Sequence, residues 1–506
     1  MRNAGILLPV FSLPSPYGIG TMGQAARNFI DFLSDAGQSC WQILPLGPTS
    51  YGDSPYQSFS AYGGNPYFID LDDLAEEGLL LPSEYKNISW GRRADDIDYG
   101  LLYRRRYPVL RRACGRLLAT SNDDYELFCQ EQAFWLEDYA LFMAIKERHG
   151  GGSWLNWPES DRLRLPKAME AARNELAEEI SFWKAVQYLF FTQWGRLKTY
   201  ANQRGISIIG DLPIYVSSDS VDVWANHEQF QLDEDRRPKE LSGCPPDGFS
   251  PNGQLWGNPL FDWEHMKKEG YDWWLRRIEF QFKIFDIIRI DHFRGFDSYY
   301  AIPKDETTAH RGCWKAGPSI DFFRTVNEKL ENPAIIAEDL GFLTPSVREL
   351  LDYTGYPGMK VLEFAFDSRD GESDYLPHKY PKNCVVYTGT HDNDTIQGWF
   401  RSAPSADADY ARRYLRLSRR EGYHWGMMRA AWGSVADLAI MQMQDILGLG
   451  SKARINVPST LGSNWRWRAL PENFSPKLTK KLHGEMALYG RLPEEKDAGK
   501  EMYYET

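Results

Sequence analysis

Four acidic residues follow short apolar segments of this chain and could carry chemistry. They are Asp211, Asp291, Glu338 and Asp392. Each of them alone could cap a following helix, since an acidic residue after a strand often plays that part. Four together, with Arg289 and His391 among them, are harder to explain as caps. If one barrel carries all four strands, the ends of those strands converge on a single pocket.

Crowded carboxyl groups suit chemistry at glycosidic bonds. Like charges that are brought together raise some pKa values and leave other groups ionised. Glycosidic chemistry uses that difference, because one carboxylate attacks while one carboxylic acid protonates the leaving oxygen. The segment IFDIIRIDHFRGF at 284–296 begins as a buried strand and ends in charge. Its charged or titratable residues after the apolar run include Arg289, Asp291, His292 and Arg294.

The elements that must position these residues form an alternating pattern. Short apolar runs recur between amphipathic helices, which is typical of a parallel sheet. The candidate strands are 5–10, 40–46, 206–212, 285–291, 334–339, 359–364 and 384–390. Helices are predicted at 24–37, from apolar side chains at helical spacing, and at 344–355, which begins with Thr and Pro. We therefore expect an α/β protein with a (β/α)8 TIM barrel.

The spacing of the candidate strands predicts insertions in that barrel. Residues 47–205 separate the second and third strands, which is far more than one crossover needs. Residues 75–185 are charged, Trp-rich and helix-like, so we expect an inserted helical subdomain there. Residues 216–275 carry Gly, Pro and aromatic side chains and are expected to form an active-site lid. The whole chain, 1–506, is expected to be one catalytic barrel without a C-terminal β-sandwich.

Composition excludes several other classes of protein. The net charge is -12, and no run of basic residues is longer than RRR at 104–106, so a nucleic-acid surface is not expected. No stretch approaches the length of a membrane span. The six cysteines lack CxxC spacing, and the apolar N-terminus lacks a cleavage site, so we expect a cytoplasmic protein. Aromatic residues make up 14%, which supplies flat faces suited to sugar rings.

A dinucleotide-binding motif is present only as a literal pattern. Gly18, Gly20 and Gly23 form GxGxxG, but no strand directly precedes them, and no acid ends the second candidate strand. The sequence contains no GxxxxGK[ST], GxSxG or HExxH. Nine scattered histidines lack the spacing of metal ligands. We therefore expect neither a cofactor nor a metal site.

Several motifs resemble a known family. RIDHFRGF, AEDLG and TGTHDNDT resemble the three catalytic blocks of the α-amylase clan. Four longer segments are similar to the 4-α-glucanotransferases of glycoside hydrolase family 77, known as amylomaltases or disproportionating enzymes. They are residues 44–71, 210–226, 245–263 and 454–468. Ser459 and Ser463 stand where that family has glycines.

The resemblance implies roles for the acidic residues. Asp291 would be the nucleophile, Glu338 the general acid/base, and Asp392 the carboxylate that stabilises the transition state. Arg289 would pair with Asp291 and keep it ionised. The implied sugar contacts are His292, His391, Asp211, Ser54, Tyr56, Asp247, Gln254, Trp256 and Asn464. Tyr51 and Tyr99 would form a second glucan-holding surface, while Arg294 is interpreted as structural.

The implied reaction is the transfer of α-1,4-glucan segments with retention. The donors would be maltodextrins or glucans derived from starch or glycogen, and the acceptor would be the 4-hydroxyl of glucose or another maltodextrin. A retaining hydrolase of the α-amylase or α-glucosidase type shares the three acids, so it stays open as an alternative. A glucan-binding protein without catalysis would have lost one of these acids, and all three are present.

Overall fold

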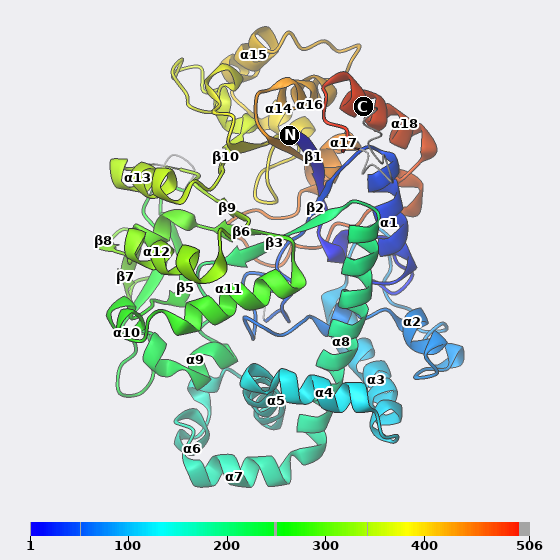
Figure 1. Cartoon of the computed structure of the whole chain (residues 1–506), viewed down its shortest axis with the longest axis vertical. Helices are drawn as coiled ribbons and strands as arrows, with labels where there is room; N and C mark the ends of the chain where they lie inside the picture. The colour runs from blue at the N-terminus through cyan, green and yellow to red at the C-terminus, as the bar shows by residue number, and fades with distance from the viewer. Residues whose placement is uncertain (1, 51, 247–249, 342, 495–506) are drawn as a thin grey trace, which may run out of the picture.

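A closed barrel of eight parallel strands forms the centre of the molecule (Figure 1). The computed structural model describes residues 2–50, 52–246, 250–341 and 343–494. Around the barrel the strands are β1 (Asn3–Leu7), β12 (Leu438–Gln442), β11 (Cys384–Tyr387), β10 (Gly358–Val361), β9 (Ile335–Ala337), β6 (Ile287–Asp291), β3 (Ser207–Pro213) and β2 (Cys40–Gln42). The pairing of β2 with β1 closes the ring. The predicted TIM barrel is confirmed.

Seven of these strands overlap the predicted segments, and the eighth, β12, was not predicted. It pairs with β1 and β11, since Leu438 is in register with both Asn3 and Val385. Its sequence, LAIMQ, runs into the short helix α17 (Met443–Ile446) with no turn residue between them. A short apolar run of this kind cannot be told from a buried helix by its periodicity.

Helices follow the strands and cover the outside of the barrel. They include α1 (Gln24–Asp35), α11 (Asp272–Ile284), α12 (Ser319–Leu330), α13 (Pro345–Thr354), α14 (Ile396–Ser402), α15 (Ser405–Tyr414), α16 (Tyr423–Gly433) and α18 (Pro476–Leu488). Figure 1 shows α11, α12 and α13 on one side, and α1 and α18 on the other. The Thr344 side chain accepts a hydrogen bond from Val347 N, so the predicted cap of α13 is confirmed.

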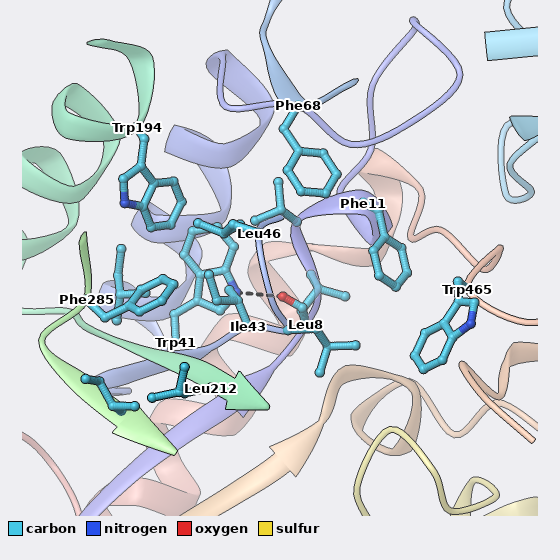
Figure 2. Close-up of a cluster of buried hydrophobic side chains, with 14 of the residues drawn as sticks. Leu8, Phe11, Trp41, Ile43, Leu46, Phe68, Trp194, Leu212, Phe285 and Trp465 are labelled. Carbon is cyan, nitrogen blue, oxygen red and sulfur yellow. Dashed lines mark hydrogen bonds between the residues drawn. The ribbon is translucent and has the colours of Figure 1, made fainter. Parts of the chain in front are cut away.

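Large aromatic side chains fill the space between the barrel and its helices (Figure 2). Trp41 of β2 is fully buried, and its Nε1 donates to the Leu8 carbonyl at 2.8 Å. Trp194 lies edge-on to Phe285, with 6.0 Å between the ring centres. Trp194 belongs to the long helix α8 (Ala177–Gln203), and Phe285 precedes β6. This contact therefore fixes α8 against the strand that carries Arg289 and Asp291.

The helical region between β2 and β3 extends beyond the predicted insertion. Its helices are α2 (Leu71–Glu76), α3 (Tyr99–Leu118), α4 (Asp123–Glu131), α5 (Ala133–Arg148), α6 (Glu159–Arg162), α7 (Pro166–Glu175) and α8 (Ala177–Gln203). Most of them lie below the barrel in Figure 1. Helix α8 starts in this region and returns to the barrel, where it carries Trp194. A separate subdomain at 75–185 stays a prediction.

A second, antiparallel sheet lies beside the barrel. Its strand order is β5 (Gln254–Pro259), β4 (Glu240–Cys244), β7 (Ser298–Pro303) and β8 (Cys313–Ala316). This sheet was not predicted, because β4 contains Gly243 and β5 contains Gly257 and Pro259, and both residue types are depleted in strands. It joins part of the region 216–275, which also contains α9 (Val221–Ala225) and α10 (Trp263–Lys268), to the chain that follows β6.

The chain ends without further strands in its described part. After Arg468 the described residues form a short 3-10 turn and helix α18. In the part of the chain that the structure describes, no helix combines the length and the apolar character needed to cross a bilayer.

Candidate active site

Three neighbouring strands bring three of the predicted acids together. In the pairing of β3 with β6, Asp211 lies opposite Arg289. In the pairing of β6 with β9, Ile290 lies opposite Ala337, so Asp291 and Glu338 follow at the next positions of adjacent strands. Glu338 N donates to the Ile290 carbonyl at 3.0 Å, which keeps the two strand ends aligned. The acids therefore meet at the carboxyl end of the barrel.

Arg289 lies between two of these carboxylates. Its Nη1 is 2.6 Å from Asp211 Oδ1, and its Nη2 is 3.0 Å from Asp291 Oδ1. The Arg289 side chain is 4% exposed and that of Asp211 is fully buried, whereas the Asp291 side chain is 29% exposed. One buried guanidinium thus pairs with two carboxylates and leaves Asp291 open to the pocket.

The Glu338 carboxylate accepts two backbone hydrogen bonds. The donors are His292 N at 2.7 Å and Leu340 N at 2.8 Å. Burial raises the pKa of Glu338 to about 7, and the charge of Asp291 acts in the same direction, while Arg289 and the two backbone donors oppose it. A carboxyl group with this pKa can give and take a proton near neutral pH.

Asp291 also has a raised pKa, but a lower one than Glu338. Burial raises the pKa of Asp291 to about 6, and the neighbouring Arg289 opposes this shift. The ion pair with Arg289 favours the ionised form of Asp291, whereas burial and the charge of Asp291 favour the protonated form of Glu338. This difference between two neighbouring carboxyl groups suits one of them to attack and the other to donate a proton.

His292 turns the chain from β6 into the 3-10 helix Phe293–Phe296. The φ of His292 is 53°, in the left-handed region, and this turn directs the backbone N–H of His292 toward the Glu338 carboxylate. Its ring lies edge-on to Trp256, with 4.8 Å between the ring centres, and burial lowers the pKa of His292 to about 3. Within the described residues its buried Nε2 has no hydrogen-bond partner. A neutral imidazole with a free nitrogen can bind a hydroxyl group.

An aromatic group forms another part of the site. Tyr56 OH donates to Asp211 Oδ2 at 2.5 Å, and its ring stacks on His391 with 5.1 Å between the ring centres. Trp465 lies 5.9 Å from both rings. His391 Nε2 is 3.3 Å from Asp392 Oδ1, so this group reaches the fourth predicted acid.

Asp392 is held by Asn456 and Arg454, neither of which was predicted as a site residue. Asn456 Nδ2 donates to Asp392 Oδ1 at 2.6 Å, and Arg454 donates to the Asp392 carbonyl. Asn456 N also donates to the His391 carbonyl at 3.1 Å. The Asp392 side chain is 47% exposed, so its carboxylate is fixed on one side and open on the other. The segment 454–468, which begins with Arg-Ile-Asn, resembles the family, but within it only Asn464 was predicted to bind sugar.

The predicted contacts Ser54, Gln254 and Trp256 take part in local hydrogen bonds. Ser54 Oγ accepts from Tyr56 N at 3.3 Å, and Gln254 Oε1 accepts from Trp256 Nε1 at 3.0 Å. The second bond orients the indole that meets His292. Asp247 and Tyr51 lie outside the described residues.

The side chains of Asn464 and Tyr99 form hydrogen bonds with the C-terminal loop at 457–465. Asn464 Oδ1 accepts from Val457 N at 3.1 Å, and its Nδ2 donates to the Thr460 carbonyl at 3.0 Å. Tyr99 OH donates to the Trp465 carbonyl at 2.8 Å. Both residues thus support the loop that presents Trp465, and their contacts with sugar stay predictions.

The barrel and its acidic strand ends define an enzyme that acts on glycosidic bonds. The family model for 4-alpha-glucanotransferases of glycoside hydrolase family 77 matches residues 8–472. The chain belongs to this family, which confirms the resemblance seen in its motifs.

The similarity of the chain to individual 4-alpha-glucanotransferases supports this assignment. The chain is 49% identical to a 4-alpha-glucanotransferase of Clostridium butyricum over 95% of this chain and 99% of that protein. It is 48% identical to that of Thermus thermophilus, over 94% and 96%. Among solved structures, an amylomaltase from Streptococcus agalactiae in complex with acarbose has a TM-score of 0.96 and 42% identity, covering 97% of this chain and all of the other.

Proposed function

We propose that this 4-α-glucanotransferase takes maltodextrins and α-1,4-glucans from starch or glycogen as donors. The segment is passed to the 4-hydroxyl of glucose or of another maltodextrin. The Streptococcus agalactiae amylomaltase was solved with acarbose bound, and its similarity to this chain supports a saccharide site here. We also propose a cytoplasmic location, which the buried thiols of Cys40, Cys114 and Cys384 support, since they stay unoxidised in a reducing compartment.

In the first step of the proposed reaction, Asp291 attacks the anomeric carbon of the donor. The bond between that carbon and the glycosidic oxygen breaks, and Glu338 gives its proton to the departing oxygen. The products are a covalent glucosyl ester on Asp291 and a shortened glucan with a free 4-hydroxyl. The observation that supports this most directly is the register of β6 and β9, which puts Asp291, held by its ion pair with Arg289, beside Glu338.

In the second step, the acceptor replaces the departed segment. Glu338, now ionised, removes the proton of the acceptor 4-hydroxyl, whose oxygen attacks the anomeric carbon and releases Asp291. Two inversions give net retention. Asp392 and His391 would hold hydroxyls of the sugar at the reacting carbon, and the neutral ring of His292 would bind another.

Incubation with maltotriose tests this function. A transferase yields glucose and longer maltodextrins with no net gain in reducing ends. A steady gain in reducing ends would instead establish a hydrolase, and unchanged maltotriose would establish a binding protein. Chromatography of the products together with a reducing-end assay separates the three outcomes.

A further inference from the structure

Met359 is a buried methionine of β10 that contacts the guanidinium of Arg289. Arg289 Nε donates to Met359 Sδ at 3.3 Å, while the two terminal nitrogens meet Asp211 and Asp291. Met359 is fully buried, and the Arg289 side chain is 4% exposed. A thioether is a weak acceptor, but it gives a buried N–H a partner without adding charge. Each of the three nitrogens of this guanidinium therefore has a partner.

The architecture of the barrel places the sulfur beside the guanidinium. β9 lies between β6 and β10 in the ring, so Arg289 and Met359 come from alternate strands (Figure 1). Alternate strands of such a barrel contribute side chains to the same interior layer. Met359 belongs to an interior cluster of buried side chains, to which strands all around the barrel contribute, including Ile336 of β9 and Val385 of β11. The Met359 side chain therefore points into the barrel, toward Arg289.

The backbone of Met359 is fixed beside the strand that carries Glu338. Met359 N donates to Asp339 Oδ1 at 2.6 Å, and Asp339 directly follows Glu338. A β-carbon at Gly358 would lie 2.6 Å from Asp339 Oδ2, so a side chain at this position would displace the carboxylate. The start of β10 is thus held against the end of β9, and Met359 is held with it.

A partner at Nε is not shared by all buried arginines of this chain. Within the described residues, Nε of Arg106 and Nε of Arg277 have no hydrogen-bond partner, although both arginines are buried. The terminal nitrogens of these two arginines donate to backbone carbonyls. The third contact is therefore a particular feature of the arginine that pairs with Asp291.

We propose that Met359 is a positioning residue for Arg289 and, through Arg289, for the Asp291 carboxylate. The inference rests on the proposed role of Asp291 as the nucleophile. Two contacts leave a planar guanidinium free to tilt about the line that joins them, and a third contact at Nε removes this freedom. Because the thioether carries no charge, it does not compete with Asp211 and Asp291 for the guanidinium, as a third carboxylate would.

The first test replaces Met359 by leucine, which has a similar volume but offers no acceptor. Release of fluoride from α-maltosyl fluoride reports the attack by Asp291, because fluoride leaves without a proton. Met359→Leu leaves Arg289 Nε without its partner and should lower kcat/KM for this donor about 5- to 20-fold. Met359→Gln supplies an amide oxygen that can accept from Nε, and should restore kcat/KM to within about threefold of the unaltered enzyme.

The pH profile separates positioning from packing. Arg289 favours the ionised form of Asp291, so a looser ion pair raises the pKa of Asp291. The acid limb of kcat/KM should therefore move to higher pH by about half a unit in Met359→Leu and stay in place in Met359→Gln. The other titratable groups that face Asp291 are Asp211, Glu338, Tyr56, His391 and Asp392. These variants alter none of them, so a moved limb reports the geometry of Arg289.

A matched control makes the same substitution elsewhere in the barrel. Met441 of β12 is 1% exposed and packs outside the interior cluster that contains Met359. Met441→Leu should change neither kcat/KM nor the acid limb. Thermal unfolding of each variant shows whether it is folded.

Several results would overturn the inference. They are an unchanged rate in Met359→Leu, a lower rate with the acid limb in place, and an equal change in Met441→Leu. An acid limb that also moves in Met359→Gln overturns the inference even if Met359→Leu does not fold. If Met359→Gln does not fold, the limb of Met359→Leu decides alone. An unaltered enzyme that releases no fluoride from this donor would instead overturn the proposed function.

Discussion

Among the single residues of the site, Arg289 decides how two carboxylates can share one pocket. Its planar guanidinium meets Asp211 and Asp291 with different nitrogens, which a lysine ammonium could not match in geometry. Asp211 Oδ2 in turn accepts a hydrogen bond from Tyr56 OH, so both oxygens of this buried carboxylate have a donor. The consequence is that the Asp291 carboxylate is held in place by Arg289 while its outer face stays open to the pocket.

The pKa values of Asp291 and Glu338 predict a bell-shaped dependence of rate on pH. Activity should fall below about pH 6, as Asp291 gains a proton, and above about pH 7, as Glu338 loses the proton that the leaving oxygen needs. The two groups interact, so the limbs report the pair. Fluoride leaves without a proton, so with α-maltosyl fluoride the alkaline limb of kcat/KM for the first step should disappear. An alkaline limb that persists with this donor would contradict the role of Glu338.

Asn456 should act on the reaction through Asp392. Asn456→Ala frees the Asp392 carboxylate from its 2.6 Å bond, and we expect kcat/KM for maltotriose to fall about 10- to 100-fold. In an Asp392→Ala background the same substitution should cost little more, because the acceptor of this hydrogen bond is already gone. Rates of the four variants form a double-mutant cycle. Equal losses in both backgrounds would show that Asn456 acts independently.

Among the elements, the strands of the barrel were the most predictable and the second sheet the least. The apolar runs that become β3, β6 and β11 are bounded by turns, so their type follows from sequence alone. β12 has no such boundary, while the Gly in β4 and the Gly and Pro in β5 argue against strands. Their strand character comes from tertiary pairing, which outweighs local preference.

The loop at 250–253 is the element that we expect to favour transfer over hydrolysis. Asn252 joins it to the segment after β7, since its carbonyl accepts from Ala309 N at 3.1 Å and its Oδ1 lies 3.2 Å from His310 Nε2. If the region 216–275 acts as a lid, shortening 248–253 should admit water and raise the ratio of hydrolysis to transfer several-fold. The ratio follows from reducing ends gained per glucose released from maltotriose. An unchanged ratio would argue against a lid.

In the whole molecule, closure of the barrel brings together residues that are far apart in the chain. Tyr56 meets Asp211, and His391 meets Trp465, across long stretches of sequence. The acids themselves were predictable because each follows a recognisable strand. Asn456 was not, because its role depends on a loop that returns from beyond β12. Local patterns thus predicted the acids that the fold brings together, whereas the groups that position them emerged only from the fold.

The central claim is that glucan transfer passes through a covalent ester on Asp291. Glu338→Gln can still form this ester from α-maltosyl fluoride, because fluoride needs no proton, but it lacks the base that activates an acceptor. The ester should therefore accumulate. Mass spectrometry of the digested variant is the most direct measurement, and the account predicts a maltosyl adduct on the peptide that contains Asp291, absent when Asp291→Asn is added. An adduct on another residue, or continued turnover of the donor by the double variant, would contradict the account.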